Sequence, residues 1–437
     1  MEKTKTFGKM FLCACGMFML LPVMVSAQNQ AGEIEPTEEA LQKRIEILEG
    51  RIEKIDAATA ETPEKSPATL RAFWKEGLRL ETDDGKFKFK IGGRTAIDAA
   101  WFSDDRELQQ AFGQAEDGFK FRRNYLFMSG QIHDWVEFKS EYEFVDEKVS
   151  HEEVYIGFTN IPYLGRIRFG NIDEPFGLEL RTSNRHTTFM ERGLTHTLVP
   201  GTNTGVVIKN LILDDRLFFG FGVNRESDWD DYNFTGRLVA IPINSDDGTR
   251  LLHLGVAGSH RNQNKTMSYN SRPESNVSIF KYVDTGDIPV ENEDILGLEF
   301  AWVHGPLSLQ SEYIFTNVSI QEGGDADFSA WYAFAAYSIT GESRFYELGS
   351  ATFDRPRVNK NFREGGIGAL ELAVRISGID LEDGVVNGGK ERDITVGLNW
   401  YFNRNAKLMF NYVRAMVDRI SYEGDLDIFQ MRAQIDF

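Results

Sequence analysis

Phe429-Gln430-Met431-Arg432-Ala433-Gln434-Ile435-Asp436-Phe437 is the stretch of this chain that decides its fold. Odd-numbered residues in it are apolar and even-numbered residues are polar or charged. Because side chains alternate between the two faces of a β-strand, this strand has one apolar face and one wet face. A soluble sandwich can use such a strand, but a β-barrel in lipid requires it, since its outside meets hydrocarbon and its lumen meets water.

The composition favours the barrel over a helical membrane protein. The chain has 437 residues, 40 of them glycine, and 12% of its residues are aromatic. Its mean hydropathy is −0.35. These values suit a transmembrane barrel, because only half of each strand has to be apolar. The net charge of −19 excludes a basic face for nucleic acid.

Residues 1–27 have the pattern of a secretory signal peptide. Three lysines precede an apolar run over residues 10–25, and Val25-Ser26-Ala27 follows as a small-residue cleavage site. The alternative is an N-terminal membrane anchor, although the run is short for one. Both cysteines, Cys13 and Cys15, lie in this segment, so we expect no disulfide or thiolate metal site in the mature chain.

The next segment, residues 28–57, predicts a helix in the periplasm. Its apolar residues are spaced 4-3-4-3, which is a short coiled-coil seam. The seam consists of Leu41, Ile45, Leu48, Ile52 and Ile55. Packing on the rest of the protein is the alternative, but so narrow a stripe favours burial against identical helices. Residues 58–74 contain Pro63 and Pro67 and are expected to form a linker.

Residues 75–437 predict the barrel itself. Apolar and polar residues alternate in segments of about ten, as in 136–144, where four charged side chains share one face. The segments 296–302 and 307–315 form a predicted hairpin around Gly305-Pro306. At roughly 20 to 25 residues per strand and connection, this region supplies about 16 antiparallel strands and a ring wide enough for an aqueous channel.

Polar segments also predict where the loops lie. Short turns alternate with longer polar stretches at residues 103–118, 262–292 and 380–390. This pattern is typical of a barrel with short turns on one rim and long loops on the other. The last strand is expected to close the barrel on the first, between residues 75 and 101.

Three blocks of the predicted barrel form a recognisable series: Gly170–Glu179 with Thr188–Arg192, Thr340–Tyr346, and Asp393–Phe402 with Leu408–Tyr412. Together and in this order they resemble the phosphate-selective porin O and P family of outer-membrane channels. A proline is more usual in that family where Phe345 stands. The resemblance implies a 16-stranded barrel, homotrimers, a loop folded into the lumen and, in some members, a periplasmic helix. It also implies that Phe437 is read by the barrel assembly machinery.

The cations expected to face the lumen are the candidates for selectivity. A pore discriminates by charge and width at its narrowest point, and guanidiniums can pass an anion along by weak bidentate contacts. Alternation leaves the register around Lys120, Arg122 and Arg123 open. The loop that resembles the family's constriction contributes three of the candidates. The full set is Lys139, Arg166, Arg168, Arg181, Arg185, Arg192, Arg375 and Arg432.

The sequence therefore predicts a porin in the outer membrane of a Gram-negative-type bacterium, in contact with lipid and lipopolysaccharide. It would pass small anions, phosphate among them, or small hydrophilic solutes. An anchoring or adhesion protein with a purely structural barrel is the alternative. No catalytic motif, cofactor fingerprint or metal-ligand spacing is present, so we expect neither an enzyme nor a cofactor.

Overall fold

The computed structural model describes residues 37–60, 69–226, 231–321 and 323–437. Two compact units, Met1–Pro67 and Ala68–Phe437, divide the chain, and each is described by itself. The predicted signal peptide lies outside the described residues. Within the described part, no helix is long and apolar enough to cross a membrane.

The helix predicted before the barrel is confirmed as α1 (Glu38–Ala60). Glu38 and Glu39 occupy its first turn, where carboxylates stabilise the positive end of the helix dipole. The seam residues Leu41, Ile45 and Leu48 are each about half exposed, as is Ile52. Their apolar face therefore has no cover among residues 37–60, the described part of this unit, and its pairing with other helices stays a prediction.

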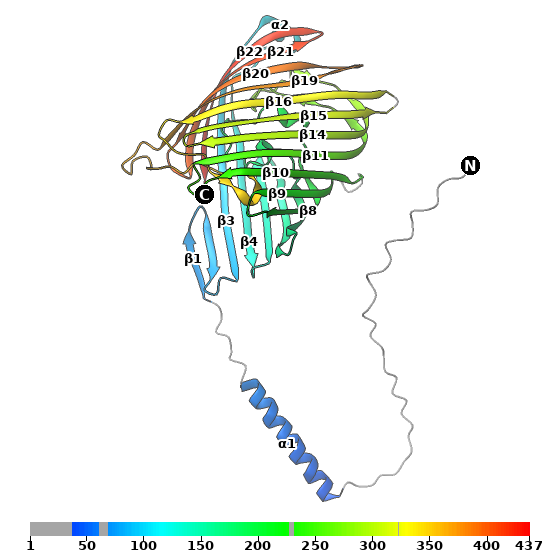
Figure 1. The fold of residues 1–437 in the computed structure, drawn as a ribbon, viewed down its shortest axis with the longest axis vertical. Helices are drawn as coiled ribbons and strands as arrows, with labels where there is room; N and C mark the ends of the chain where they lie inside the picture. Colours follow the sequence, from blue (N-terminus) through cyan, green and yellow to red (C-terminus); the bar gives the residue numbers. More distant parts are fainter. Residues whose placement is uncertain (1–36, 61–68, 227–230, 322) are drawn as a thin grey trace, which may run out of the picture. The chain divides into compact units, whose positions relative to one another are not determined.

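Among the described residues, eighteen strands form one antiparallel sheet, and all but β1 (Leu70–Trp74) and β2 (Leu78–Thr82) close into a sixteen-stranded barrel (Figure 1). The predicted fold class is confirmed. The barrel strands are β3 (Phe87–Asp104), β4 (Gly118–Ile132), β5 (Val136–Val145), β6 (Lys148–Ile161), β7 (Gly165–Asp173), β8 (Thr202–Ile212), β9 (Leu217–Arg225), β10 (Asn233–Asn244), β11 (Arg250–Met267), β14 (Ile288–His304), β15 (Leu307–Ile320), β16 (Gly324–Ser338), β19 (Ala369–Asp383), β20 (Val386–Tyr401), β21 (Ala406–Arg419) and β22 (Tyr422–Asp436).

The terminal strand β22 closes the barrel on β3, as predicted. The pairing ends at Asp104, slightly beyond the expected limit of residue 101. The backbones of Phe437 and Gly93 exchange two hydrogen bonds, with N to O distances of 3.0 and 2.7 Å. Residues 88–91 of β3, which precede this point in the chain, pair along the same edge with β2. Residues 70–74, expected in the linker, are therefore part of a hairpin that extends the barrel wall.

Strand alternation produces an apolar outside and a polar inside. On β14, the outward Leu296, Leu298 and Phe300 are 48%, 50% and 36% exposed, whereas the inward Glu299 is 4% exposed. The predicted hairpin of β14 and β15 is present, and Gly305 turns it with a φ of 56°. An isolated outward face of this kind is stable in hydrocarbon and not in water.

The loops differ from the prediction in two respects. We call the rim that holds Phe437 and the turn 305–306 the terminal rim, and the other, which also has two-residue turns such as 146–147, the opposite rim. Long connections 105–117, 174–201 and 268–287 lie at the opposite rim, but the longest one, 339–368, lies at the terminal rim. The polar stretch 380–390 is no loop, because β19 and β20 continue through it to a two-residue turn.

The lumen is only partly a channel. Inward residues of β21 and β22, among them Val413, Val417 and Ile428, pack with Leu198 and Tyr282 of the long connections into an apolar core. Apolar side chains on both faces of a strand need cover on both sides, and here the infolded loops supply the inner cover. The expected aqueous lumen is thus restricted to the side of the barrel where the inner wall is polar and open.

Candidate functional site

The connection 174–201 enters the barrel between β7 and β8, and we call it the inward loop. It contains α3 (Leu178–Arg181) and the 3₁₀ helix η1 (Leu194–Leu198). Gly177 adopts a φ of 72°, which suits glycine and turns the chain into the lumen. The backbone N–H groups of Leu178 and Glu179 then donate to the carboxylate of Glu312 on β15, at 2.6 and 2.8 Å.

Arg375 fixes the inward loop to the wall. Its Nη1 lies 3.1 Å from Oε1 of Glu179, and its Nη2 donates to the carbonyl of Glu191 at 3.0 Å. The same guanidinium forms an ion pair with Glu274 of the connection 268–287 and lies 4.3 Å from the ring centre of Phe189. Arg375 is 1% exposed, so it points inward as predicted but is buried beneath the loops.

Arg432 has a similar position at the closing seam. Its Nε and Nη2 each lie 2.7 Å from the carboxylate oxygens of Asp98, and Nη2 also lies 2.7 Å from Glu191. The carbonyl of Met190 accepts a further hydrogen bond at 2.5 Å. With all three guanidinium nitrogens hydrogen-bonded and 3% exposure, Arg432 holds the loop against the wall and is closed to the channel.

Arg192 stabilises the inward loop from within. Its guanidinium donates to the carbonyls of Glu179, Leu180 and Thr182 at 3.2, 3.0 and 3.4 Å. These carbonyls belong to the end of α3, where a cation complements the negative end of the short helix. Burial lowers the pKa of Arg192, although the residue stays cationic at physiological pH.

The other wall candidates line an open path. Lys139 and Arg168 have side chains 18% and 12% exposed, and Arg166 is 38% exposed. Each lies beside a carboxylate: Lys139 is 2.6 Å from Glu141, and Arg168 is 2.7 Å from Glu137. The open part of the lumen therefore follows the inner wall of β4 to β8, which we call the pore wall.

Two loop arginines face this pore wall. Arg181 forms an ion pair with Asp173 at 2.6 Å, and Arg185 lies 3.6 Å from Glu141. Both side chains are 17% exposed. Arg185 also lies 4.9 Å from the ring centre of Phe127, a cation–π distance. The inward loop thus presents cations to a wall that already carries cations.

A β-bulge settles the register that alternation left open. Where β3 pairs with β4, the register shifts between Ala96 and Ile97, so that Arg122 and Arg123 both lie on the inner face. Arg122 makes a bidentate ion pair with Glu191, at 2.6 and 2.7 Å. Bulges insert one residue into a strand and re-aim its side chains. Nothing in the local sequence marks this one, so the prediction missed two pore-wall cations.

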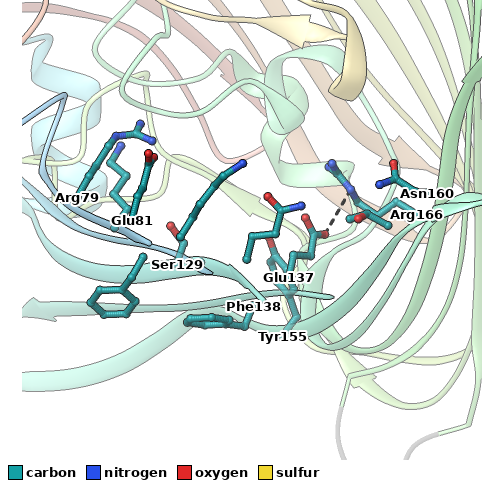
Figure 2. Close-up of a pocket in the computed structure, with 14 residues that line it drawn as sticks. Arg79, Glu81, Ser129, Glu137, Phe138, Tyr155, Asn160 and Arg166 are labelled. Carbon is teal, nitrogen blue, oxygen red and sulfur yellow. Dashed lines mark ion pairs between the residues drawn. The ribbon is translucent and has the colours of Figure 1, made fainter. Parts of the chain in front are cut away.

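At the terminal rim the pore wall widens into a cavity of about 490 Å³. Figure 2 shows Arg79, Glu81, Glu137 and Arg166 on the inner side of its strands, while the ring of Phe138 lies on the other side. Lys88 and Lys90 of β3 also line it. In the described part of the chain, neither lysine forms an ion pair with a carboxylate. The mouth therefore carries two lysines without a carboxylate partner among the described residues.

The connection 339–368 reaches the inward loop from the terminal rim. Arg237 on β10 donates to the carbonyls of Ser350 and Ala351, which holds the connection inside the barrel. Nδ1 of His186 lies 2.9 Å from Oδ1 of Asp354. Burial lowers the pKa of His186 to about 4, although Asp354 opposes the shift. Loops from opposite rims therefore meet in the lumen.

Potential metal-ligating side chains are dispersed within the described residues. In the described residues, no three His, Cys, Asp or Glu side chains are grouped to hold a metal ion. The carboxylates along the pore wall are instead engaged by arginine and lysine, as the pairs above describe. The site is an aqueous path between charged walls.

Comparison with known proteins agrees with this geometry. The family model "Phosphate-selective porin O and P" matches residues 89–437. Porin O of Pseudomonas aeruginosa is 30% identical over 414 residues, covering 83% of this chain and 91% of that protein. Among solved structures, the anion-selective porin of Comamonas acidovorans (TM-score 0.51, 12% identity, 80% of this chain and 100% of the other) has the same fold. The outer membrane channel DcaP of Acinetobacter baumannii gives a TM-score of 0.51 at 12% identity, over 82% of this chain and 99% of the other.

The family match, the closed barrel and the charged path agree with one another. The protein resides in the outer membrane and forms a channel for small solutes. The chain belongs to the phosphate-selective porin O and P family.

Proposed function

We propose that the channel prefers small anions, phosphate among them, and that the preference arises at the terminal mouth. Lys88 and Lys90 carry the proposal, because they line the cavity with Arg79 and have no carboxylate partner within the described residues. A cleft with low-dielectric walls and cations that lack a carboxylate partner raises the local concentration of anions, so this mouth would favour their entry. The paired cations of the pore wall, such as Arg168 with Glu137, contribute less, because their charge is already balanced.

Reversal potential in a potassium chloride gradient tests this preference. The wild-type channel should be anion-selective, and the double variant K88Q/K90Q should lose most of that selectivity while conducting as before. Lys86→Gln is the matched control, since Lys86 is exposed on the turn before β3 and pairs with Asp84 at 3.3 Å. Cation selectivity in the wild type, or an equal effect of the control, contradicts the proposal. Block of chloride current by phosphate at low concentration distinguishes phosphate preference from general anion preference.

We also infer a homotrimer in contact with outer-membrane lipid and lipopolysaccharide, with α1 in the periplasm. The exposed seam of α1 supports self-association, since Leu41, Ile45 and Leu48 are about half exposed among the residues that the structure describes. A solved structure with the same fold, OmpT of Vibrio cholerae, is a trimer form. Recognition of Phe437 by the barrel assembly machinery stays a prediction.

A structural anchor is the second candidate. The three infolded connections fill much of the lumen, and a fully blocked barrel would serve only to hold α1 near the cell wall. Conductance steps in a planar bilayer decide between the two. A blocked barrel gives no steps, whereas the open pore wall, with Arg166 38% exposed, predicts them. We infer a channel and not an enzyme, because the family that the chain belongs to consists of porins.

A further inference from the structure

The connection 339–368 also covers part of the outside of the barrel. Whereas its first half is held in the lumen, residues 360–367, which we call the outer segment, pack on the outward side of β20. Trp400 faces outward there, because it follows the inward, fully buried Asn399. Nε1 of Trp400 donates to the carbonyl of Ile367 at 2.7 Å. The outer segment therefore lies against the end of the barrel wall, at the terminal rim.

An aromatic cluster attaches the outer segment to the wall. The ring centre of Phe362 lies 5.3 Å from that of Trp400 and 5.4 Å from that of Phe402. The N–H of Phe362 also donates to the carbonyl of Phe402 at 2.7 Å. On the same face of β20, Val396 and Leu398 precede Trp400 and are apolar and exposed. Aromatic rings at the end of a lipid-facing apolar band are typical of the membrane–water interface, so the outer segment lies at the level of the lipid headgroups.

Two cations belong to the outer segment at this level. Lys360 and Arg363 are both exposed, and among the residues that the structure describes neither forms an ion pair with a carboxylate. The guanidinium carbon of Arg363 lies 5.7 Å from the ring centre of Phe362. The adjacent acid, Glu364, accepts a hydrogen bond from Nδ2 of Asn361 at 2.8 Å. The outer segment therefore combines two cations that have no carboxylate partner with an aromatic anchor in the headgroup region.

Outward cations near the opposite rim lie among carboxylates instead. Arg414 forms ion pairs with Asp425 and Asp427. Arg392 lines a groove on that side together with Asp418 and Asp425. These carboxylates compete with an incoming phosphate for the cations and repel it. Charge complementarity therefore favours an anionic headgroup at the outer segment and disfavours one near the opposite rim.

We propose that the outer segment binds the phosphate group of an anionic phospholipid through Lys360 and Arg363. A guanidinium can contact two phosphate oxygens at once, and the ammonium group adds a second positive charge. The inference rests on the proposed placement of α1 in the periplasm, because β1 and β2, which follow α1 in the chain, lie at the terminal rim. That placement directs the outer segment toward the inner leaflet of the outer membrane, which consists of phospholipid.

Native mass spectrometry of the purified full-length protein in detergent tests the site. Phosphatidylglycerol is titrated against the wild type, against K360Q/R363Q, and against the control K390Q/R414Q, which removes two outward cations near the opposite rim. The affinity should fall about 30-fold in K360Q/R363Q, since each cation near an anionic lipid contributes roughly a factor of five. It should not change in the control. No fall in K360Q/R363Q, or an equal fall in the two double variants, overturns the proposal.

A titration with lipid A separates the two leaflets. Weaker binding of lipid A than of phosphatidylglycerol to the wild type is expected. If lipid A binds more tightly and K360Q/R363Q loses it, the outer segment faces the outer leaflet, and both this proposal and the placement of α1 are wrong. Conductance of the same preparations in a planar bilayer tests the channel separately, because K360Q/R363Q should conduct as the wild type does whether or not it binds lipid.

A substitution that keeps both charges tests the anchor. Phe362→Ala removes the ring that packs on Trp400 and should weaken phosphatidylglycerol binding, because Lys360 and Arg363 are then no longer held at the headgroup level. Phe300→Ala is the matched control, since Phe300 is an outward phenylalanine on β14 and 36% exposed. It should leave lipid binding unchanged. Equal affinities in Phe362→Ala and the wild type overturn the anchoring role of the aromatic cluster.

Discussion

Arg432 and Asp98 close the barrel with a bidentate ion pair between its last and first strands, with both N to O distances at 2.7 Å. Their side chains are 3% and 1% exposed. The ion pair therefore fixes the register in which β22 pairs with β3, because a shift of β22 by one residue would turn Arg432 toward lipid.

Asp98→Asn should destabilise the folded barrel by about 3 to 5 kcal/mol, because it leaves Arg432 buried without its main counter-charge. The measurement is the urea concentration at which the folded barrel is lost. Gels detect the folded barrel by its heat-modifiable mobility. The double variant D98L/R432M should recover most of the loss, since two apolar side chains remove both charges together. Single and double variants of equal stability would contradict this account.

Glu191→Gln should loosen the inward loop. Glu191 forms ion pairs with Arg122 on β4 and with Arg432 on β22. Although burial acts in the other direction, these arginines hold the pKa of Glu191 below its usual range. A depressed pKa means that this carboxylate stabilises loop docking at neutral pH and ceases to do so in strong acid. Larger and noisier single-channel currents are expected at pH 7.

Glu143→Gln is the control for that substitution, because Glu143 pairs with Arg123 on the pore wall at 3.2 Å and does not touch the inward loop. It should change ion selectivity but leave current noise at the wild-type level. Equal noise in the two variants would mean that Glu191 does not dock the loop.

The sequence predicted the architecture because alternation is a local property. The outward Leu296 and Leu298 and the inward Glu299 follow directly from it. Alternation also predicted that Arg375 and Arg432 point inward, but it does not reveal what lies above them. Their burial depends on contacts with residues that are 196 and 241 positions away. Only the folded chain brings those loops into the lumen.

The pore wall had a second unpredictable feature. Arg122 lines it through a bulge that depends on pairing between β3 and β4, not on the sequence of β4 alone. The sequence of the connection 339–368 likewise does not reveal from which rim this connection enters the lumen. His186 and Asp354, which join it to the inward loop, are 168 residues apart and were not expected to meet.

Acidification should release this contact. The pKa of His186 falls from an ordinary 6.5 to about 4 through burial, so the undocked loop binds a proton more readily than the docked one. Docking is thus fully supported above pH 6.5 and weakens as the pH falls from 6.5 to 4. Asp354 acts in the same direction, because its pKa is also depressed, against its burial, by the hydrogen bond from His186.

Single-channel conductance between pH 7.5 and 4 measures this release and should rise on acidification. His186→Gln keeps a hydrogen-bond donor toward Asp354 but has no titrating group. Its conductance should therefore change less over the same range. An identical pH curve for the variant and the wild type would assign the response to other groups.

The exposed seam of α1 leads to a last prediction, for the trimer. Leu48 and Ile47 are neighbours with 52% and 56% exposure, but only Leu48 lies on the seam. Burying a leucine contributes about 1.5 to 3 kcal/mol, and an aspartate at an apolar seam position forfeits that contribution. Leu48→Asp should therefore lower the temperature at which trimers dissociate, whereas Ile47→Asp should leave it unchanged. Deleting residues 28–57 should reproduce the effect of Leu48→Asp. If trimers of the deletion variant dissociate at the wild-type temperature, the barrel contacts alone hold the copies together.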